Sequence, residues 1–358
     1  MERESHMRKL ATVRRVSEVR PIPNADNIEL AVVDGWQCVV KKGEFTVGEL
    51  VIYCEVDTVL PVHPDYEFLR QYGYVQRDWL PNGEGFRLRT LKLRGQVSQG
   101  LLLPLSKGFR HDGNCEMWYE GKEVTHLLGA VKWEPPVPAQ LAGMAKGSFP
   151  SYIPKTYQER VQNLVGVLFT TDLVVDYLWE ATLKLDGCSC TFYHRDGEVG
   201  ACSREINFKL EQEGNVFVDM FHQLDLGTKL PGYGNIAIQG ELMGPGIPRS
   251  GGNREGLHRC QFYVYDVWDI DGSYYLPKGK RDAIIEALGL LSVPVIHPGA
   301  TLQELGCDTL EGMLQYADRR SINHEVAEGV VFKNVCGSIG AAPYSFKCIS
   351  NRYLLREK

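Results

Sequence analysis

Several signatures that would assign this sequence to a well-known class are missing. Its ten cysteines form no C-x-x-C pair, so we do not expect a structural zinc site, and reduced thiols fit a cytoplasmic protein. No apolar run approaches the roughly 20 residues of a membrane span, and no signal-peptide core follows the N-terminus. The sequence also has no Rossmann or P-loop fingerprint and no internal repeat.

The sequence also has no overall excess of positive charge. The 358 residues carry a net charge of −6, so any nucleic-acid binding must come from a local patch. One such patch is the segment FRLRTLKLRG, whose basic side chains are Arg87, Arg89, Lys92 and Arg94. On charge pattern alone, a solvated strand face explains these residues equally well.

The N-terminal part is a series of short β-branched segments separated by Gly, Pro, Asn and Asp. Residues 8–130 include ATVRRVSEVR, IELAVVDGWQCVV and ELVIYCEVDTVL. This spacing predicts a small β-barrel of the OB type, with a β-sandwich as the alternative. The basic segment would be one strand on a face of that barrel. Residues 131–150 are dense in Pro, Gly and Ala, which predicts an interdomain linker.

Residues 151–358 combine strands and helices without a regular βαβ rhythm. Thr156 followed by Glu159 is a capping-box pattern and predicts a helix over 156–168. Further helices are expected at 211–224, 278–289 and 302–319. The strand-like segments between them include NIAIQGELMG and CQFYVYDVWDID. The pattern predicts an α+β domain built on antiparallel sheet.

A lysine in an apolar run, within ATLKLDG, is the first candidate for chemistry. Burying Lys184 is costly unless its charge or its amine has a function. The alternative is that Lys184 has no such function and lies at a strand edge, where its ammonium reaches solvent. The K-x-D-G pattern is common by chance, but polar residues recur in order at the ends of later strands. These are Ser203-Arg204, Glu241 in QGELMG, Tyr265-Asp266 in FYVYDVW, Glu328 in EGVVFK and Lys347 in SFKCIS.

In this ordered set the sequence resembles the covalent nucleotidyltransferases, and more narrowly the ATP-dependent RNA ligases of the Deinococcus and Naegleria type. Segments such as PNADNIEL, KLRGQVSQGLLLP and PKTYQERVQNL also look like that family, so the resemblance covers nearly the whole chain. It implies an OB domain over 8–130 and an antiparallel-sheet adenylyltransferase domain, ATP-grasp-like, over 151–358. Such enzymes attack the α-phosphorus of ATP with a lysine, release pyrophosphate and form lysyl-AMP.

The resemblance implies roles for the residues around the nucleotide. Lys184 would be the nucleophile, with Asp186 and Gly187 in its motif. Arg204 would contact the ribose or the 5′-phosphate strand, and Glu241 the ribose hydroxyl. Because a free lysine has a pKa near 10.4, we expect burial, a cation or basic neighbours to lower the pKa of Lys184.

Adenine stacking is implied for Tyr265. Strand parity places Phe262 on the other face of the same strand, so Phe262 is the rival. Glu328 would bind Mg²⁺ or Mn²⁺, helped by Glu241, because hard cations prefer oxygen ligands.

Two lysines are candidates for binding phosphate. Lys347 is implied to neutralise the α-phosphate. Lys333 is a weaker candidate, since an exposed loop lysine would explain it equally well. Many relatives carry K-x-K in this last motif, whereas Ile349 stands at the second position here, so the source of that charge stays open.

The implied reaction passes AMP from lysine to a 5′-phosphate, after which a 3′-OH displaces it. The partners would be RNA or RNA/DNA duplex ends, which the OB domain would hold through its basic segment, as in RNA nick repair. No membrane partner is expected, and a monomer is favoured. Capping enzymes and ATP-dependent DNA ligases place an OB domain after the last motif, and the short segment after Lys347 is expected to leave no room for one, which favours RNA ligation. The alternatives are nonetheless a DNA ligase or capping-type nucleotidyltransferase, and a non-enzymatic OB-type RNA-binding protein with an inactive ligase domain.

Overall fold

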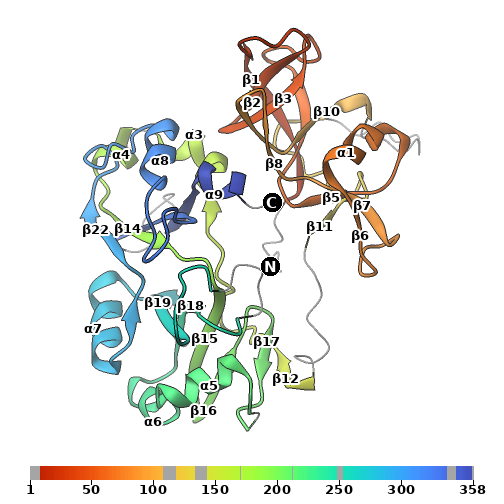
Figure 1. Ribbon diagram of the computed structural model, residues 1–358. Coiled ribbons are helices and arrows are strands. Elements are labelled where there is room, and N and C mark those ends of the chain that lie inside the picture. The colour runs from red at the N-terminus through yellow and green to blue at the C-terminus, as the bar shows by residue number, and fades with distance from the viewer. Residues whose placement is uncertain are drawn as a thin grey trace. The chain divides into compact units, whose positions relative to one another are not determined.

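The chain divides into two compact units, residues 1–136 and 137–357 (Figure 1). The computed structural model describes residues 9–107, 118–133, 143–169, 171–211, 213–247, 253–336 and 344–356. Each unit has hydrophobic cores of its own within these residues. No helix in the described ranges is both long enough and apolar enough to cross a membrane.

The main sheet of the first unit has the strand order β10–β4–β1–β2–β3. Its strands are β1 Ala11–Pro21, β2 Ile28–Val33, β3 Trp36–Lys41, β4 Leu50–Cys54 and β10 Leu101–Pro104. The long strand β1 pairs with β4 through residues 11–15 and with β2 from Val16 onward, with an irregular register between Val16 and Glu18. Because a bulge bends and twists a strand, β1 can serve both halves of a curled antiparallel sheet.

A second sheet and a hairpin complete the first unit. The second sheet has the order β11–β5–β7–β6. Its strands are β5 Thr58–Leu60, β6 Tyr74–Gln76, β7 Glu84–Arg87 and β11 Val131–Lys132, and the hairpin is β8 Thr90–Leu93 with β9 Gln96–Gln99. Short helical turns are η1 Pro64–Leu69, α1 Arg70–Gly73 and η2 Leu105–Lys107. The hairpin is tied to the main sheet because the Val39 N–H donates to Ser98 Oγ at 3.0 Å.

The described residues of the second unit form two sheets. The β18 sheet has the order β12–β17–β16–β15–β18–β19–β20, with β21 parallel to β19. Its strands are β12 Ala145–Ser148, β15 Cys188–Arg195, β16 Glu198–Cys202, β17 Ile206–Phe208, β18 Ile236–Met243, β19 Gln261–Asp269, β20 Tyr274–Tyr275 and β21 Leu291–Ser292. The β14 sheet has the order β13–β24–β23–β14–β22. Its strands are β13 Glu159–Arg160, β14 Trp179–Lys184, β22 Val295–Ala300, β23 Gly329–Asn334 and β24 Ser345–Ile349.

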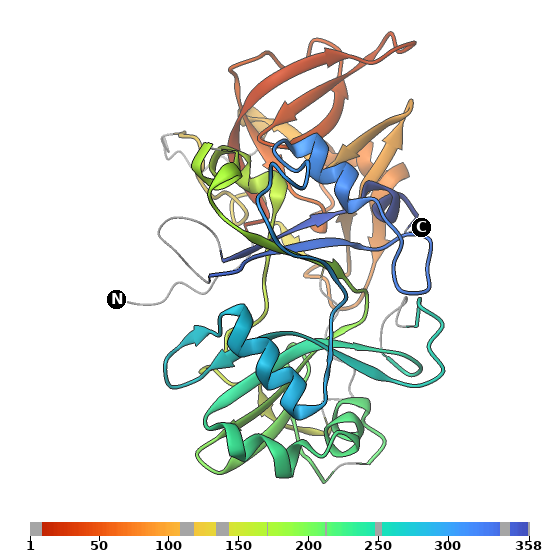
Figure 2. The ribbon, with the colours of Figure 1, turned by 90° about the vertical axis from the view of Figure 1, so that its left-hand side faces the viewer.

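Helices cover the outer face of each sheet (Figures 1 and 2). One core packs α5 Val216–Gln223, α6 Leu226–Lys229, η4 Leu230–Tyr233 and α7 Lys278–Leu288 against the β18 sheet. Another packs η3 Val161–Leu164, α3 Val165–Leu168, α4 Thr171–Val175 and α8 Leu310–Ala317 against the β14 sheet. The last helix, α9 Asn351–Arg356, follows β24. A third core joins the end of β14 to β18 and β19, through residues such as Leu183, Met243 and Tyr263.

The helix predicted over 156–168 is wrong in its first half. Residues 156–158 are irregular, β13 follows, and helical structure begins only at Val161. Thr156 caps no helix, because its hydroxyl bonds to Ser189 instead, at 3.2 Å. The Glu159 carboxylate likewise bonds to Asn163 at 2.8 Å. A tertiary hydrogen bond at Thr156 and a local one at Glu159, to a residue four positions later, have replaced the capping pattern. Helices do occur within the ranges predicted at 211–224, 278–289 and 302–319.

Candidate active site

Lys184 is the last residue of β14, and antiparallel pairing places it opposite Gly329, the first residue of β23. Glu328 comes directly before Gly329, so two strand ends bring a lysine and a glutamate together. The Lys184 Nζ donates to Glu328 Oε2 at 2.7 Å, and the side chains are 22% and 16% exposed. A Cβ at Gly329 would lie 2.1 Å from the Cys348 carbonyl oxygen, so the close approach of β24 requires glycine here.

Three carboxylates set the charge state of this lysine. Burial disfavours the ammonium, but the negative charges of Glu328, Glu241 and Asp186 outweigh burial and raise the pKa of Lys184 above its ordinary value. The prediction that the surroundings lower this pKa is therefore wrong for the free protein. The carboxylates come from separate segments, and their joint effect is invisible in the local sequence. The amine becomes a good nucleophile only when those charges are neutralised.

Glu241 lies on β18 and holds the turn that follows the lysine. Its Oε1 accepts a hydrogen bond from the backbone N–H of Gly187 at 2.8 Å. A Cβ on Gly187 would lie 2.4 Å from the carbonyl oxygen of Leu242. The glycine of K-x-D-G is therefore needed because the turn passes directly against β18.

The aromatic residues of β19 divide between two faces. Phe262 is 3% exposed and packs edge-on against Phe192, with ring centroids 4.7 Å apart, in the core beneath α5. Tyr265 lies on the opposite face, where its hydroxyl donates to Thr156 Oγ1 at 3.1 Å and lies 3.2 Å from Ser189 Oγ. Phe262 is thus corrected from a candidate base-stacking residue to a core residue, which leaves Tyr265.

The inner face of the β14 sheet carries all three candidate lysines. Thr182, Val331 and Lys347 are direct neighbours on β14, β23 and β24. Lys184 and Lys333 lie two residues along their strands from these neighbours, and side chains two residues apart share a face. The Lys347 ammonium lies 5.2 Å from the centre of the Tyr157 ring.

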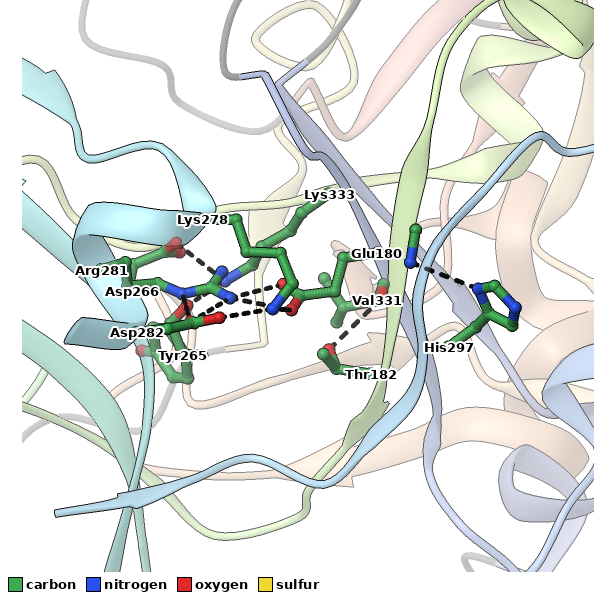
Figure 3. Close-up of polar contacts among 11 residues, drawn as sticks. Glu180, Thr182, Tyr265, Asp266, Lys278, Arg281, Asp282, His297, Val331 and Lys333 are labelled. Carbon is green, nitrogen blue, oxygen red and sulfur yellow. Dashed lines mark hydrogen bonds and ion pairs between the residues drawn. The ribbon is translucent and has the colours of Figure 1, made fainter. Parts of the chain in front are cut away.

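Lys333 belongs to a buried ionic network between the two sheets (Figure 3). It is 2% exposed, and its Nζ donates to the Tyr265 carbonyl oxygen and, at 2.8 Å, to Asp266 Oδ1. Burial lowers the pKa of Lys333 despite the opposing charge of Asp266. Its strand neighbour Glu180 accepts from Arg281 Nη2 at 2.8 Å. The interpretation of Lys333 as an exposed loop residue is wrong, because its buried ammonium holds β19. Its role in binding phosphate stays a prediction.

The carboxylates near Lys184 fit a divalent cation that takes its other ligands from a nucleotide. Among the residues described, no three histidine, cysteine or acidic side chains gather closely enough to form a metal site alone. Glu328 and Glu241 nevertheless both act on Lys184. Mg²⁺ and similar ions are commonly held by one or two carboxylates together with substrate phosphates and water.

Arg204 is exposed, in the connection between β16 and β17. Its Nε lies 3.8 Å from the Glu205 carboxylate, and both side chains are more than 40% exposed. Within the described ranges, no hydrogen bond or ion pair joins Arg204 to another predicted residue of the site.

In the first unit, the basic segment is not one strand. Arg87 ends β7, Arg89 lies in the following connection, and Lys92 and Arg94 belong to the β8–β9 hairpin. Leu88 between them is buried, and Arg94 has a left-handed φ of 48° in the hairpin turn. The four basic side chains are therefore divided among a strand end, a connection and a hairpin.

Sequence reasoning missed a basic and aromatic cluster around Trp133. The guanidinium of Arg87 lies 4.6 Å from the Trp133 ring centre and that of Arg77 lies 5.7 Å from it. Arg87 is also paired with Asp57 at 2.6 Å. Partial desolvation and the nearby positive charge of Arg87 lower the pKa of Arg89, although its side chain is exposed. Arg77 lies ten residues before Arg87, outside the charged segment, so only the strand pairing of β6 with β7 brings them together.

Comparison with known proteins places this arrangement in a family. A family model of an OB-fold domain matches residues 10–105, and a model described as RNA ligase matches residues 178–349. A solved structure of Naegleria gruberi RNA ligase with PPi is 37% identical, with a TM-score of 0.84, covering 97% of this chain and 98% of that chain. This chain belongs to the RNA ligase family.

Two further structures of the Naegleria gruberi RNA ligase are equally similar. One is a variant with ATP and Mn and the other a variant with AMP and Mn, each 37% identical with a TM-score of 0.84 over 97% of this chain and 98% of that chain. No curated protein matches. The predicted fold, an OB-type barrel followed by a sheet-rich ligase domain, is confirmed for this RNA ligase.

Proposed function

We propose that this RNA ligase uses ATP to form lysyl-AMP on Lys184, transfers AMP to a 5′-phosphate end and seals that end to a 3′-OH. The observation that carries the proposal is the Lys184–Glu328 pair at 2.7 Å, with Glu241 beside it. The similar Naegleria gruberi structures with ATP, AMP and Mn support the choice of nucleotide and of a divalent cation.

In the first step, the Lys184 ammonium gives up one proton to water, and the neutral nitrogen attacks the α-phosphorus. An N–P bond forms, the P–O bond to pyrophosphate breaks, and a second proton leaves the nitrogen for water, so that the phosphoramidate keeps one N–H. Glu328 and Glu241 would hold the cation, which supplies positive charge against the phosphates and against these carboxylates. Lys347 shares the inner face of the β14 sheet with Lys184 and is suited to neutralise the α-phosphate. Asp186 and Gly187 fix the turn beside the nucleophile.

Tyr265 is the proposed platform for adenine. It lines a small cavity between β14 and β19 together with Thr182 and Val293. Burial raises the pKa of the Tyr265 hydroxyl, which therefore stays protonated, and its hydrogen bonds to Ser189 and Thr156 fix the ring. Arg204 is proposed to contact the ribose or the 5′-phosphate strand.

Nucleic-acid ends are the proposed partners of the first unit. Arg89, Lys92 and Arg94 are exposed and Arg87 lies beside them in sequence, which suits contact with backbone phosphates. Because these side chains are divided among β7, the following connection and the β8–β9 hairpin, they are suited to a nucleic-acid strand that passes over several elements rather than along one β-strand. RNA nick repair is the proposed role.

The test is the mass of the purified protein after incubation with ATP and Mn²⁺. We expect one added AMP on the wild type and none on Lys184→Ala, together with loss of joining of a nicked RNA duplex. GTP in place of ATP separates a ligase from a capping-type enzyme, because only the true donor leaves an adduct. Sealing of an all-DNA nick at equal rate would favour a DNA ligase. RNA joining that persists in Lys184→Ala would refute the proposal.

A further inference from the structure

The carboxylate of Asp186 is held from the far end of the chain. Its Oδ2 accepts a hydrogen bond from the Tyr353 hydroxyl at 2.9 Å, across 167 positions of sequence. The same oxygen lies 3.7 Å from Arg254 Nη1. The guanidinium of Arg254 in turn lies 4.5 Å from the centre of the Tyr353 ring. Three separate segments therefore meet at one carboxylate, two residues after Lys184.

The tyrosine is rigid enough to orient its partner. Tyr353 lies on α9 and is 5% exposed, and its ring packs with Val326 and Ile349. Arg254 stacks on this ring, an arrangement that favours both the cation and a fixed ring plane. A hydroxyl on a fixed ring presents its hydrogen bond in one direction, so little entropy is lost when it binds the carboxylate.

Asp186 is placed where its direction matters for the nucleophile. Its side chain is 17% exposed, and its charge is one of those that act on Lys184. Glu241 holds the same turn through the backbone N–H of Gly187. The turn is thus fixed twice, by its backbone from β18 and by its side chain from α9.

We propose that Tyr353 is a positioning residue for the adenylylation of Lys184, acting through Asp186, with Arg254 fixing its ring. The inference rests on the proposed function, since it concerns the step that forms lysyl-AMP. It makes α9 a working part of the active site rather than a terminal helix that only adds stability.

The first test is a double-mutant cycle with Tyr353→Phe, Asp186→Ala and the double variant. A hydrogen bond to a charged group is worth about 1.5–3 kcal/mol, so Tyr353→Phe should slow adduct formation at saturating ATP by roughly ten- to a hundredfold. In the Asp186→Ala background the same change should have no further effect. Tyr274→Phe removes the hydroxyl of an exposed tyrosine on β20 and should leave the rate unchanged.

An adduct rate equal to that of the wild type in Tyr353→Phe overturns the proposal. So does an equal slowing in both backgrounds, because that would show an effect independent of Asp186. The second test needs no activity: hydrogen exchange of residues 185–188 without nucleotide should be faster in Tyr353→Phe than in the wild type, and unchanged exchange overturns the proposal. If the wild type forms no adduct with ATP, the proposed function fails, while the exchange experiment still decides the role of Tyr353.

Discussion

Replacing Lys333 with methionine tests whether the buried network between the sheets stabilises the second unit. Lys333 and Asp266 are 2% and 3% exposed and lie 2.8 Å apart. Removing one partner of a buried pair leaves an uncompensated charge, at a cost of about 3–5 kcal/mol. The Tyr344 hydroxyl still bonds to Asp266 at 3.0 Å, so we expect the lower end, about 3 kcal/mol. For a domain of this size that corresponds to a fall in Tm of roughly 6–12 °C.

The assay is scanning calorimetry of the full chain, combined with hydrogen exchange of β19 and β23. The exchange measurement shows which strands are destabilised. We expect faster exchange in β19, because Lys333→Met also removes the donor to the Tyr265 carbonyl oxygen. The variant Lys333→Met/Asp266→Asn removes both charges and should recover part of the lost stability. Lys280→Met on α7 is the matched control, since Lys280 is exposed, and should change the free energy of unfolding by less than about 0.5 kcal/mol.

A Tm for Lys333→Met within 2 °C of the wild type, taking ~1 kcal/mol as the limit, would refute this reasoning. It would show that the network contributes no more than a surface pair. If the single and the double variant are equally stable, the charge left on Asp266 costs no free energy of unfolding. That result would contradict the electrostatic explanation but not the loss of the hydrogen bonds.

Two further predictions concern a glycine and a thiol. Gly187→Ala should slow adduct formation by roughly ten- to a hundredfold, because the new Cβ would lie 2.4 Å from the Leu242 carbonyl oxygen and break the hydrogen bond to Glu241. Adduct mass against time measures it, and an unchanged rate would contradict the close packing. Burial raises the pKa of Cys54 to about 12, so iodoacetamide at pH 8 should leave it unmodified in the folded protein while it labels the exposed Cys336. Peptide mapping in and out of urea tests this, and early labelling of Cys54 would contradict its burial.

The control for the glycine variant is Gly147→Ala. No atom lies within 4 Å of a Cβ built at Gly147, so this change adds the same methyl group without a clash. It should leave both the rate of adduct formation and the Tm unchanged. A loss of rate in both variants would point to an effect of alanine in general rather than to the contact with β18.

The residues of the ordered motifs could be named from the sequence because the family resemblance matches them motif by motif. Antiparallel pairing of β14 with β23 brings Lys184 and Glu328 together, and Glu241 on β18 meets the same turn through the backbone N–H of Gly187. What the sequence did not reveal is the number of carboxylates that converge on Lys184, and so the direction of its pKa shift. That direction depends on distances between segments, which no local pattern contains.

Contacts between buried side chains of the two sheets also could not be predicted from the sequence. Lys333 looks the same in the sequence whether it is an exposed loop residue or the partner of Asp266, because its burial follows from the facing of two sheets. The prediction that the basic segment is one strand was wrong because a local pattern suggested more order than the structure has. Its alternating pattern fits a strand, but the buried Leu88 and the left-handed turn at Arg94 divide it.

The choice between Tyr265 and Phe262 needs both strand parity and side-chain packing. Parity separates the two rings onto opposite faces of β19 but does not say which face is inner. Gly240 on β18 decides it, because a Cβ there would lie 2.5 Å from the Phe262 ring and equally close to the Tyr263 carbonyl oxygen. The ring of Phe262 fills the space that a side chain at Gly240 would need, on the side covered by α5. The glycine of the QGELMG motif therefore fixes Phe262 in the core and leaves Tyr265 facing the β14 sheet.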